Sequence, residues 1–335
     1  MDIFRRLFSQ GNTKPDHSAQ AQVDAPTPPA PEVIEITPAV VGTTPLPPTP
    51  PVEMMPPMNI GDGITRPLPP ETVISSSNEH LMFGQATDVG MVRTNNQDAV
   101  FSFVSTSRSS QQRPDFGLFV VADGMGGHHD GEKASAITAS MVASYITHHI
   151  FLPMLNSDDD TERVPVTESM IAAVQKANAD IITKVPDGGT TLTAVAVIGD
   201  LAYVAHVGDS RIYLVTKDNN IEQITRDHSL VQRYVELNLL TREEASVHAQ
   251  KNVLYRALGQ SETLEVDALT RRLPPNAKLM LCSDGLWNLV TEQEIADIVS
   301  NHSNPQEACD KLVALANAHG GTDNITVILL RIPAH

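Results

Sequence analysis

Five aspartates in this sequence share a setting that suits metal chemistry. Each lies at the edge of a short apolar stretch or in a break between two such stretches, and two of them are followed by glycine. They are Asp98, Asp123, Asp209, Asp284 and Asp323. Carboxylate oxygens are the ligands that Mg²⁺ and Mn²⁺ prefer in proteins. A single aspartate of this kind is more simply a turn residue, but five in the same setting favour a shared cation site.

The stretch around Asp123 carries the strongest of these signals. An apolar run at positions 119–122 leads into Asp123 and then into a turn with glycine at positions 124, 126 and 127. Glycine accepts positive φ and lets another group approach the backbone closely. A strand that ends in a carboxylate and bare peptide groups therefore suits an ion or a phosphate. Zinc is disfavoured, because neither cysteine lies in these motifs and no histidine pair has ligand spacing.

The elements that must position these residues lie in the last three quarters of the chain. Sixteen of the 24 prolines fall between Pro15 and Pro70, in a segment without a sustained apolar period. Such a segment cannot bury enough surface to offset its conformational entropy. We therefore expect residues 1–78 to be a disordered, proline-rich tail and residues 79–335 to form one folded domain.

The charge, the hydropathy and the cysteine content limit the possible partners and the cellular compartment of the protein. The net charge is −17, and most of it belongs to the expected domain. An acidic surface argues against nucleic acid as a partner. No stretch approaches the roughly 18 consecutive apolar residues of a transmembrane segment. Cys282 and Cys309 alone make no disulfide framework, which favours a reducing compartment. We expect a cytoplasmic, monomeric protein.

The order of expected elements indicates stacked antiparallel sheets. Strands are predicted at 82–88, 99–104, 116–122, 190–198, 201–207, 212–215, 221–224, 266–269, 279–282 and 325–330, and helices at 132–149, 167–184, 291–301 and 305–318. Hairpin-linked strands with helices grouped in pairs argue against a parallel, doubly wound sheet. The expected class is α+β, a four-layer α-β-β-α sandwich of two antiparallel sheets flanked by helix pairs. Residues 226–259 are polar and weakly helical, and we expect them to form an insertion over the site.

The motifs resemble, in type and order, those of the metal-dependent serine/threonine protein phosphatases of type 2C, and especially the bacterial branch. The matching segments are Arg93 with Asn96-Gln97-Asp98, Val121 to Gly127, Gly189-Thr190-Thr191, Val207 to Arg211, Arg226 to Ser229, Ser283-Asp284-Gly285 and Asp323 to Thr326. The resemblance covers about residues 84–331. It implies hydrolysis of phosphoserine and phosphothreonine in proteins by a metal-activated water.

The resemblance also implies roles for individual residues. Asp123 would bridge two Mn²⁺ or Mg²⁺ ions, and the Gly124 carbonyl would bind one of them. Asp284 and Asp323 would complete the shell of the other ion, with Asp98 at or near a metal-bound water. Asp209 resembles the ligand of a third, weaker metal site. Arg93 resembles the residue that holds the substrate phosphate, and its planar guanidinium can grip two phosphate oxygens.

At two positions the sequence differs from many relatives, one involving a proton donor and the other an anionic side chain. Met125 stands where many eukaryotic members have a histidine proposed to protonate the leaving group, and a thioether cannot supply a proton. Gln97 stands where many relatives have glutamate. The bacterial branch tolerates both. The expected partners are phosphorylated proteins, including a serine/threonine kinase or its substrates. A non-catalytic phosphoprotein-binding pseudophosphatase and a phosphatase of small phosphoesters are the alternatives.

Overall fold

Side chains that alternate along strand β3 (Phe116–Gly126) separate two layers of the protein. Leu118 and Val120 pack into a hydrophobic cluster with helices α1 (Asp130–Ile146) and α3 (Val166–Lys184). Phe119 and Val121 point the other way, into a second cluster between the two sheets. Successive side chains of a strand point to opposite faces, so this sheet is covered on both sides.

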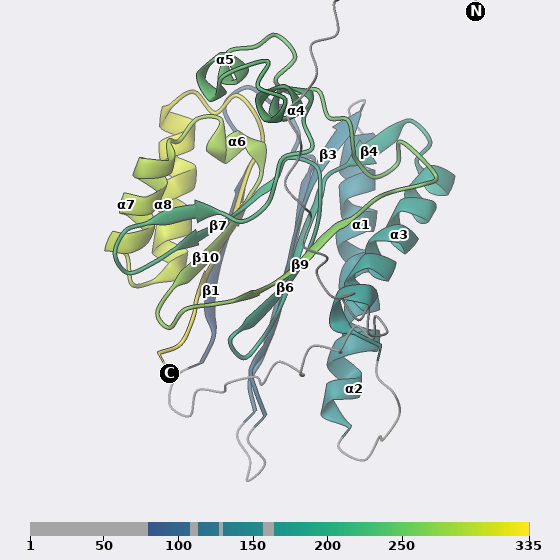
Figure 1. Ribbon diagram of the computed structural model, residues 1–335, viewed down its shortest axis with the longest axis vertical. Coiled ribbons are helices and arrows are strands. Elements are labelled where there is room, and N and C mark those ends of the chain that lie inside the picture. The colour runs from purple at the N-terminus through teal and green to yellow at the C-terminus, as the bar shows by residue number, and fades with distance from the viewer. Residues whose placement is uncertain (1–79, 108–112, 127–129, 157–163, 335) are drawn as a thin grey trace, which may run out of the picture. The chain divides into compact units, whose positions relative to one another are not determined.

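Strand β11 (Ile325–Arg331) shows the same alternation in the other sheet. Ile328 and Leu330 join the cluster between the sheets, whereas Val327 and Leu329 pack into a third cluster. That third cluster includes buried residues of helices α7 (Glu292–Asn301) and α8 (Pro305–Ala318). Figure 1 shows the resulting order, with α1 and α3 on one side of the stacked sheets and α7 and α8 on the other. The predicted α-β-β-α sandwich is confirmed.

The computed structural model describes residues 80–107, 113–126, 130–156 and 164–334. Within these ranges every strand pairing is antiparallel. The first sheet has the order β1-β11-β10-β7-β8, with β1 at Met82–Asp88, β7 at Arg211–Val215, β8 at Ile221–Gln223 and β10 at Lys278–Cys282. The second has the order β2-β3-β5-β6-β9, with β2 at Asp98–Ser105, β5 at Leu192–Ile198, β6 at Leu201–Val207 and β9 at Asp267–Arg272, and β4 (Gly188–Thr190) pairs with the end of β3. The prediction of a disordered tail at 1–78 lies outside the described residues.

The insertion predicted at 226–259 contains two short helices, α4 (Leu230–Glu236) and α5 (Arg242–Ser246). Ser229 caps α4, and a reciprocal capping box between Thr241 and Glu244 begins α5. Such caps satisfy backbone N–H groups that have no partner within a helix. We call residues 226–259 the flap. It lies at the end of the sandwich where α6 (Asp284–Trp287) also lies (Figure 1).

Four elements differ clearly from their predicted forms. The strand expected at 116–122, with a glycine turn after it, instead continues through Asp123 to Gly126, because residues 124–126 pair with β4. The helix expected at 132–149 ends at Ile146 and continues through a π-helical turn (Thr147–Phe151) into α2 (Leu152–Leu155). The strand expected at 190–198 is split at Thr191, because that residue turns its backbone N–H and its side chain to Asp123. The short helix α6 was not predicted.

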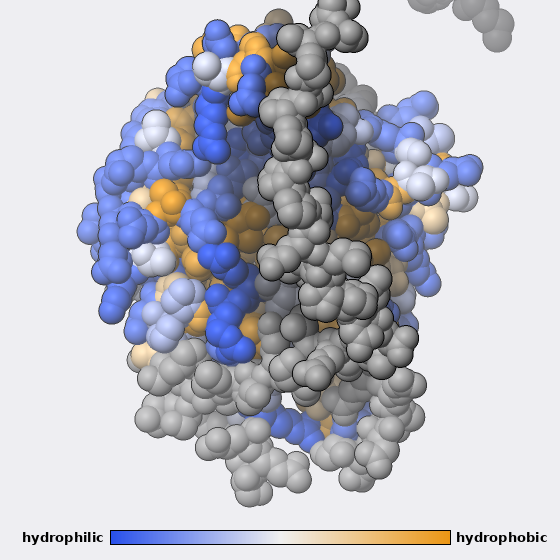
Figure 2. Space-filling model, viewed as in Figure 1, coloured by the Kyte–Doolittle hydropathy of each residue, from blue (hydrophilic) through white to orange (hydrophobic). Residues whose placement is uncertain are grey.

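The described surface is largely hydrophilic, and Figure 2 shows hydrophobic patches interrupting it at the end formed by the flap. Leu237, Leu239 and Val247 of the flap are exposed. None of the helices in the described part of the chain is both long and apolar enough to span a membrane.

Candidate metal centre

The five predicted aspartates come together at one edge of the sandwich. In the second sheet, Asp98 at the start of β2 stands directly opposite Asp123 of β3. In the first sheet, β7 begins, β10 ends and β11 begins at the same edge, because Cys282 pairs with both Arg211 and Val327. The turns that carry the other three aspartates extend from these strand ends. Two sheets thus contribute carboxylates to one site.

The electrostatics of Asp123 show how close these carboxylates are. Burial raises the pKa of Asp123 well above its usual value, and the negative charges of Asp98, Asp284, Asp209 and Asp323 raise it further. All four other predicted ligands therefore act on this one side chain. Clustered carboxylates disfavour one another's ionised form unless a cation is near.

The pKa values of three neighbours of Asp123 are raised for the same reasons. Burial raises the pKa of Asp98 to about 7, hydroxyls of Thr326 and Ser283 oppose the shift, and the charges of Asp284 and Asp323 add to it. Burial and the charge of Asp323 raise the pKa of Asp284 to about 6. Burial followed by the charge of Asp284 raises the pKa of Asp209. A bound divalent cation would offset this repulsion between buried carboxylates.

Asp98 offers a direct test of whether these residues fit a cation. Ser283 Oγ donates to Asp98 Oδ2 at 2.8 Å, which fixes the carboxylate. The other oxygen, Oδ1, is buried and has no hydrogen-bond partner among the described residues. Buried polar atoms are nearly always paired, so an unpaired carboxylate oxygen beside other carboxylates is suited to a cation or its water.

The residues fit ions that keep part of their hydration. In the described ranges no group of three or more His, Cys, Asp or Glu side chains is already arranged around one ion position. Mg²⁺ and its close analogues are usually held by one or two carboxylates and several waters, so a site for them needs no closed cage of protein ligands. The carboxylate-only donor set supports Mg²⁺ or Mn²⁺ over zinc.

The backbone around Asp123 is held by two threonines of the Gly189-Thr190-Thr191 motif. Asp123 N–H donates to Thr191 Oγ1 at 3.0 Å, and Thr191 N–H donates to the Asp123 carbonyl at 2.8 Å. Thr190 Oγ1 donates to the same carbonyl at 2.9 Å. The next residue, Gly124, leaves no room for a side chain, since an added Cβ would lie 2.3 Å from the Gly131 carbonyl oxygen. Close backbone packing therefore requires glycine after Asp123.

Asn324 ties the loop that carries Arg93 to the loop that carries Asp323. Its Nδ2 donates to the carbonyls of Val89 and Asn95, each at 2.9 Å, and its Oδ1 accepts from Gln97 N–H at 2.8 Å. Arg93, from the same loop, donates from Nη2 to Asp323 Oδ2 at 2.7 Å. Sequence reasoning assigned no role to Asn324, although its place after Asp323 was a usable signal.

Helix α6 links the remaining two aspartates. Asp284 is its first residue, and Asn288 Nδ2 donates to Asp284 Oδ2 at 3.2 Å. Trp287 Nε1 donates to the Asp209 carbonyl at 3.0 Å, so the helix also supports the turn between β6 and β7. This short helix therefore orients residues from two distant segments.

His228, which sequence reasoning named only as part of a motif, joins the flap to that turn. Its backbone N–H donates to the Gly208 carbonyl at 2.7 Å, and its Nδ1 accepts from Gly208 N–H at 3.0 Å. Its Nε2 lies 3.2 Å from Asp267 Oδ2, which fits a proton on Nε2. The side chain is buried, and burial lowers its pKa, which favours the neutral ring that this arrangement requires.

Comparisons with known proteins identify the family and the fold. The family model described as protein phosphatase 2C matches residues 92–317. The protein phosphatase PhpP of Streptococcus pneumoniae serotype 2 is 36% identical over 249 residues, which are 73% of this chain and 94% of that protein. The Mycobacterium tuberculosis serine/threonine phosphatase PstP/Ppp is similar with a TM-score of 0.61 and 32% identity, over 76% of this chain and 99% of that chain. A structure of the PstP catalytic domain in complex with two manganese ions is similar with a TM-score of 0.60 and 31% identity, over 76% of this chain and 98% of that chain.

The match spans most of the described domain, and the relatives are covered almost completely. The matched family consists of enzymes that use two Mn²⁺ or Mg²⁺ ions to hydrolyse phosphoserine and phosphothreonine in proteins. This chain belongs to the protein phosphatase 2C family of metal-dependent serine/threonine phosphatases.

Proposed function

We propose that the edge of the sandwich around Asp123 is the catalytic centre, with the residue roles that the sequence predicted. The observation that carries this proposal is the effect of four other carboxylates on Asp123, together with the unpaired Oδ1 of Asp98. Asp123 would hold both ions with help from the Gly124 carbonyl, and Asp284 and Asp323 would hold one of them. Asp98 would act on a metal-bound water, and Asp209 would serve a third, weaker site.

Two bound Mn²⁺ or Mg²⁺ ions would supply a water acidified to a nucleophile and would neutralise phosphate charge. The protein orients the groups around that chemistry. Ser283 and the two threonines hold Asp98 and Asp123 in place. The Asp98 carboxylate, fixed through Oδ2 by Ser283 and with Oδ1 free of hydrogen bonds to described residues, is suited to accept a hydrogen bond from a metal-bound water.

Arg93 would orient the substrate phosphate. Its side chain is about half exposed at the mouth of the site, and its partner Asp323 is about one third exposed. Ion pairs this open to solvent contribute only about 0–1 kcal/mol, so the guanidinium can exchange one anion for another at little cost. Met125 supplies no proton, and Gln260 Nε2 lies 3.8 Å from its sulfur. We assign leaving-group protonation to solvent; His128 and His129 lie outside the described residues.

The finer assignments concern partners and setting. Protein substrates follow from the family, and we propose that they include a serine/threonine kinase or the substrates of one, since such kinases make the phosphoesters this family hydrolyses. We further propose a monomer in the cytoplasm, in line with two buried free cysteines. The domain is assigned to residues 79–335, in line with a family match that begins at position 92.

Phosphopeptide hydrolysis with and without metal tests the catalytic assignment. The EDTA-dialysed protein should release no phosphate from a phosphothreonine peptide, and Mn²⁺ or Mg²⁺ should restore release. Full activity in chelator would contradict the assigned centre. A pseudophosphatase would bind the peptide without turnover under both conditions. A panel of phosphorylated metabolites, assayed in parallel, identifies a small-molecule phosphatase if its members are hydrolysed faster than the peptide.

A further inference from the structure

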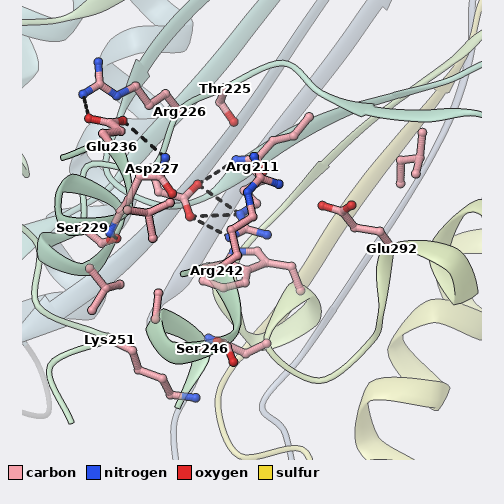
Figure 3. Close-up of a pocket in the computed structure, with 18 residues that line it drawn as sticks. Arg211, Thr225, Arg226, Asp227, Ser229, Glu236, Arg242, Ser246, Lys251 and Glu292 are labelled. Atoms are coloured by element: carbon pink, nitrogen blue, oxygen red, sulfur yellow. Dashed lines mark hydrogen bonds and ion pairs between the residues drawn. The ribbon is translucent and has the colours of Figure 1, made fainter. Parts of the chain in front are cut away.

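A cavity of about 700 Å³ lies between the flap and the edge of the first sheet, beside the metal centre. Figure 3 shows its lining, which comes from the flap with α4 and α5, from strands β7 and β8, and from the segment that runs from the end of α6 to the start of α7. Val231, Val235 and Ala245 give it an apolar wall. A cavity of this size accommodates a few residues of a bound peptide or a drug-sized ligand.

Most of the charge in this cavity is already paired. Arg211 makes a bidentate ion pair with Asp227, with nitrogen–oxygen distances of 2.7 to 3.2 Å, and its guanidinium stacks 3.6 Å from the centre of the Trp287 ring. Arg226 pairs with Glu236, as Figure 3 shows. These four charged side chains neutralise one another in pairs, and we call them the paired frame. They are therefore not available to bind a charged ligand.

Two other cationic side chains of the lining are not part of the paired frame. The side chains of Arg242 and Lys251 make no hydrogen bond or ion pair with any described residue, and both line the cavity. One lining carboxylate, that of Glu292, likewise has no partner in the described part of the chain. The free side chains therefore carry two positive charges and one negative charge. This local excess of unpaired positive charge favours an anionic ligand in the cavity, against the net negative charge of the chain as a whole.

The cavity shares a wall with the metal centre. Trp287 and Asn288 line the cavity, and their polar atoms donate to the Asp209 carbonyl and to the Asp284 carboxylate. A peptide whose phosphoresidue occupies the metal centre can therefore extend a neighbouring side chain toward Arg242 and Lys251.

We propose that this cavity binds a second anionic side chain of the phosphoprotein substrate, near the residue that is hydrolysed. The inference rests on the proposed catalytic centre and deepens it, because it names the class of substrate: segments with a second phosphate or a carboxylate within reach. The metal centre binds the phosphate that is hydrolysed. Arg242 and Lys251 bind the anionic group of the second side chain. The apolar wall packs against the aliphatic part of that side chain.

The experiment uses the full chain with Mn²⁺ and a series of phosphothreonine peptides. A parent peptide has only neutral flanking residues. The others place glutamate, or a non-hydrolysable phosphonate analogue of phosphoserine, at each of several positions on either side. The readout is the ratio of kcat/KM for each anionic peptide to that of the parent. We expect the ratio to rise about three- to tenfold at a preferred spacing, as for two partly exposed ion pairs, and to decline with added salt. A larger rise for the phosphonate than for glutamate identifies a phosphate site.

Variants of the cavity residues test whether the preference for anionic peptides arises in this cavity. Arg242→Gln combined with Lys251→Gln should bring the ratio to about one, and Glu292→Gln should increase it because the opposing charge is removed. Arg242→Lys with Lys251→Arg keeps the charges and should keep the ratio. Lys217→Gln is the matched control, since this exposed cation lies outside the flap and does not line the cavity. A ratio near one at every spacing in the unmodified protein, or a ratio that survives the double glutamine variant, overturns the inference. Failure to hydrolyse the neutral parent peptide would instead refute the catalytic assignment.

Discussion

Arg93 and Asp323, from opposite ends of the domain sequence, form an ion pair with Nη2 and Oδ2 2.7 Å apart. One is the expected phosphate-binding residue, and the other is an expected metal ligand. A cation on Asp323 and a phosphate beside Arg93 each compete with this pair. Binding of metal is therefore expected to free the guanidinium for the substrate, which couples the two ligands through one exposed contact.

Replacement of Arg93 by alanine should separate these functions. We expect kcat/KM for a phosphopeptide to fall about 10- to 100-fold, the equivalent of the roughly 1.5–3 kcal/mol typical of hydrogen bonds to charged groups. Mn²⁺ affinity, measured by titration calorimetry, should be unchanged or higher because the competing cation is gone. Weaker Mn²⁺ binding would show that Arg93 supports the metal site instead. Arg113→Ala is the control, because that side chain bonds backbone carbonyls of Met154 and Leu155.

Asp123→Asn and Asp284→Asn should each lose nearly all activity and remain folded. Both carboxylates have raised pKa values because of burial and like charges, so their ionised forms oppose folding without a cation. In EDTA each variant should therefore melt at the same temperature as the unmodified protein or above it. Adding Mn²⁺ should raise the Tm of the unmodified protein more than that of either variant. Asp310→Asn, on the exposed side of α8, should behave as the unmodified protein. A variant with full turnover would contradict its assignment as a ligand.

Asn324→Asp should destabilise the loop that carries Arg93. The change keeps the size of the side chain but removes the two N–H donors to the Val89 and Asn95 carbonyls, and it places an oxygen against them. We expect the free energy of unfolding to fall by about 2 kcal/mol or more, as for buried groups that lose their partners. Urea unfolding measures this, and hydrogen exchange should show faster opening at residues 89–97. Asn252→Asp, at an exposed position of the flap, is the control. Unaltered exchange in the loop would refute the positioning role.

His206 should make stability depend on pH. Burial, followed by the charge of His228, lowers its pKa to about 3, from a usual value near 6.5. Between these values the unfolded chain binds a proton that the folded chain does not. Stability from the neutral ring is therefore complete above about pH 6.5 and is lost as pH falls toward 3, with a slope of at most about 1.4 kcal/mol per pH unit.

Urea unfolding at several pH values tests this in EDTA. His206→Gln should show a shallower loss of stability on acidification than the unmodified protein, because one titrating group is absent. The exposed His148, replaced in the same way, should leave the slope as it was. An unchanged slope in His206→Gln would mean that the buried ring, which bonds Thr193 Oγ1 and the Arg226 carbonyl, does not control acid stability.

Removal of residues 1–78 should leave hydrolysis of a small phosphopeptide little changed. The family match begins at position 92, and every assigned site residue follows it. The measurement is kcat and KM for the shortened and the full-length chain. A large rise in KM, or loss of the folded domain, would mean that the segment contributes to the site or to folding.

Much of the fold was predictable because it depends on local pattern. β1, β6 and α8 have the predicted bounds, since alternating or helically spaced apolar residues end at clear turns and caps. The split of the strand at Thr191 and the short helix α6 were missed. Both serve contacts with residues far away in the sequence, namely Asp123 and Asp209, which no local pattern encodes.

The sequence by itself determined the chemistry of the centre: five carboxylates at the edges of apolar runs, glycine after Asp123 and Asp284, and the order of motifs. The tertiary structure decided how these groups meet. The register that sets Asp98 opposite Asp123 depends on pairing along the whole of β2 and β3. The contact between Arg93 and Asp323, and the two unpaired cations of the flap cavity, depend on loops that are brought together only when the two sheets stack. Such contacts arise from packing over the entire domain, and so only the folded chain reveals them.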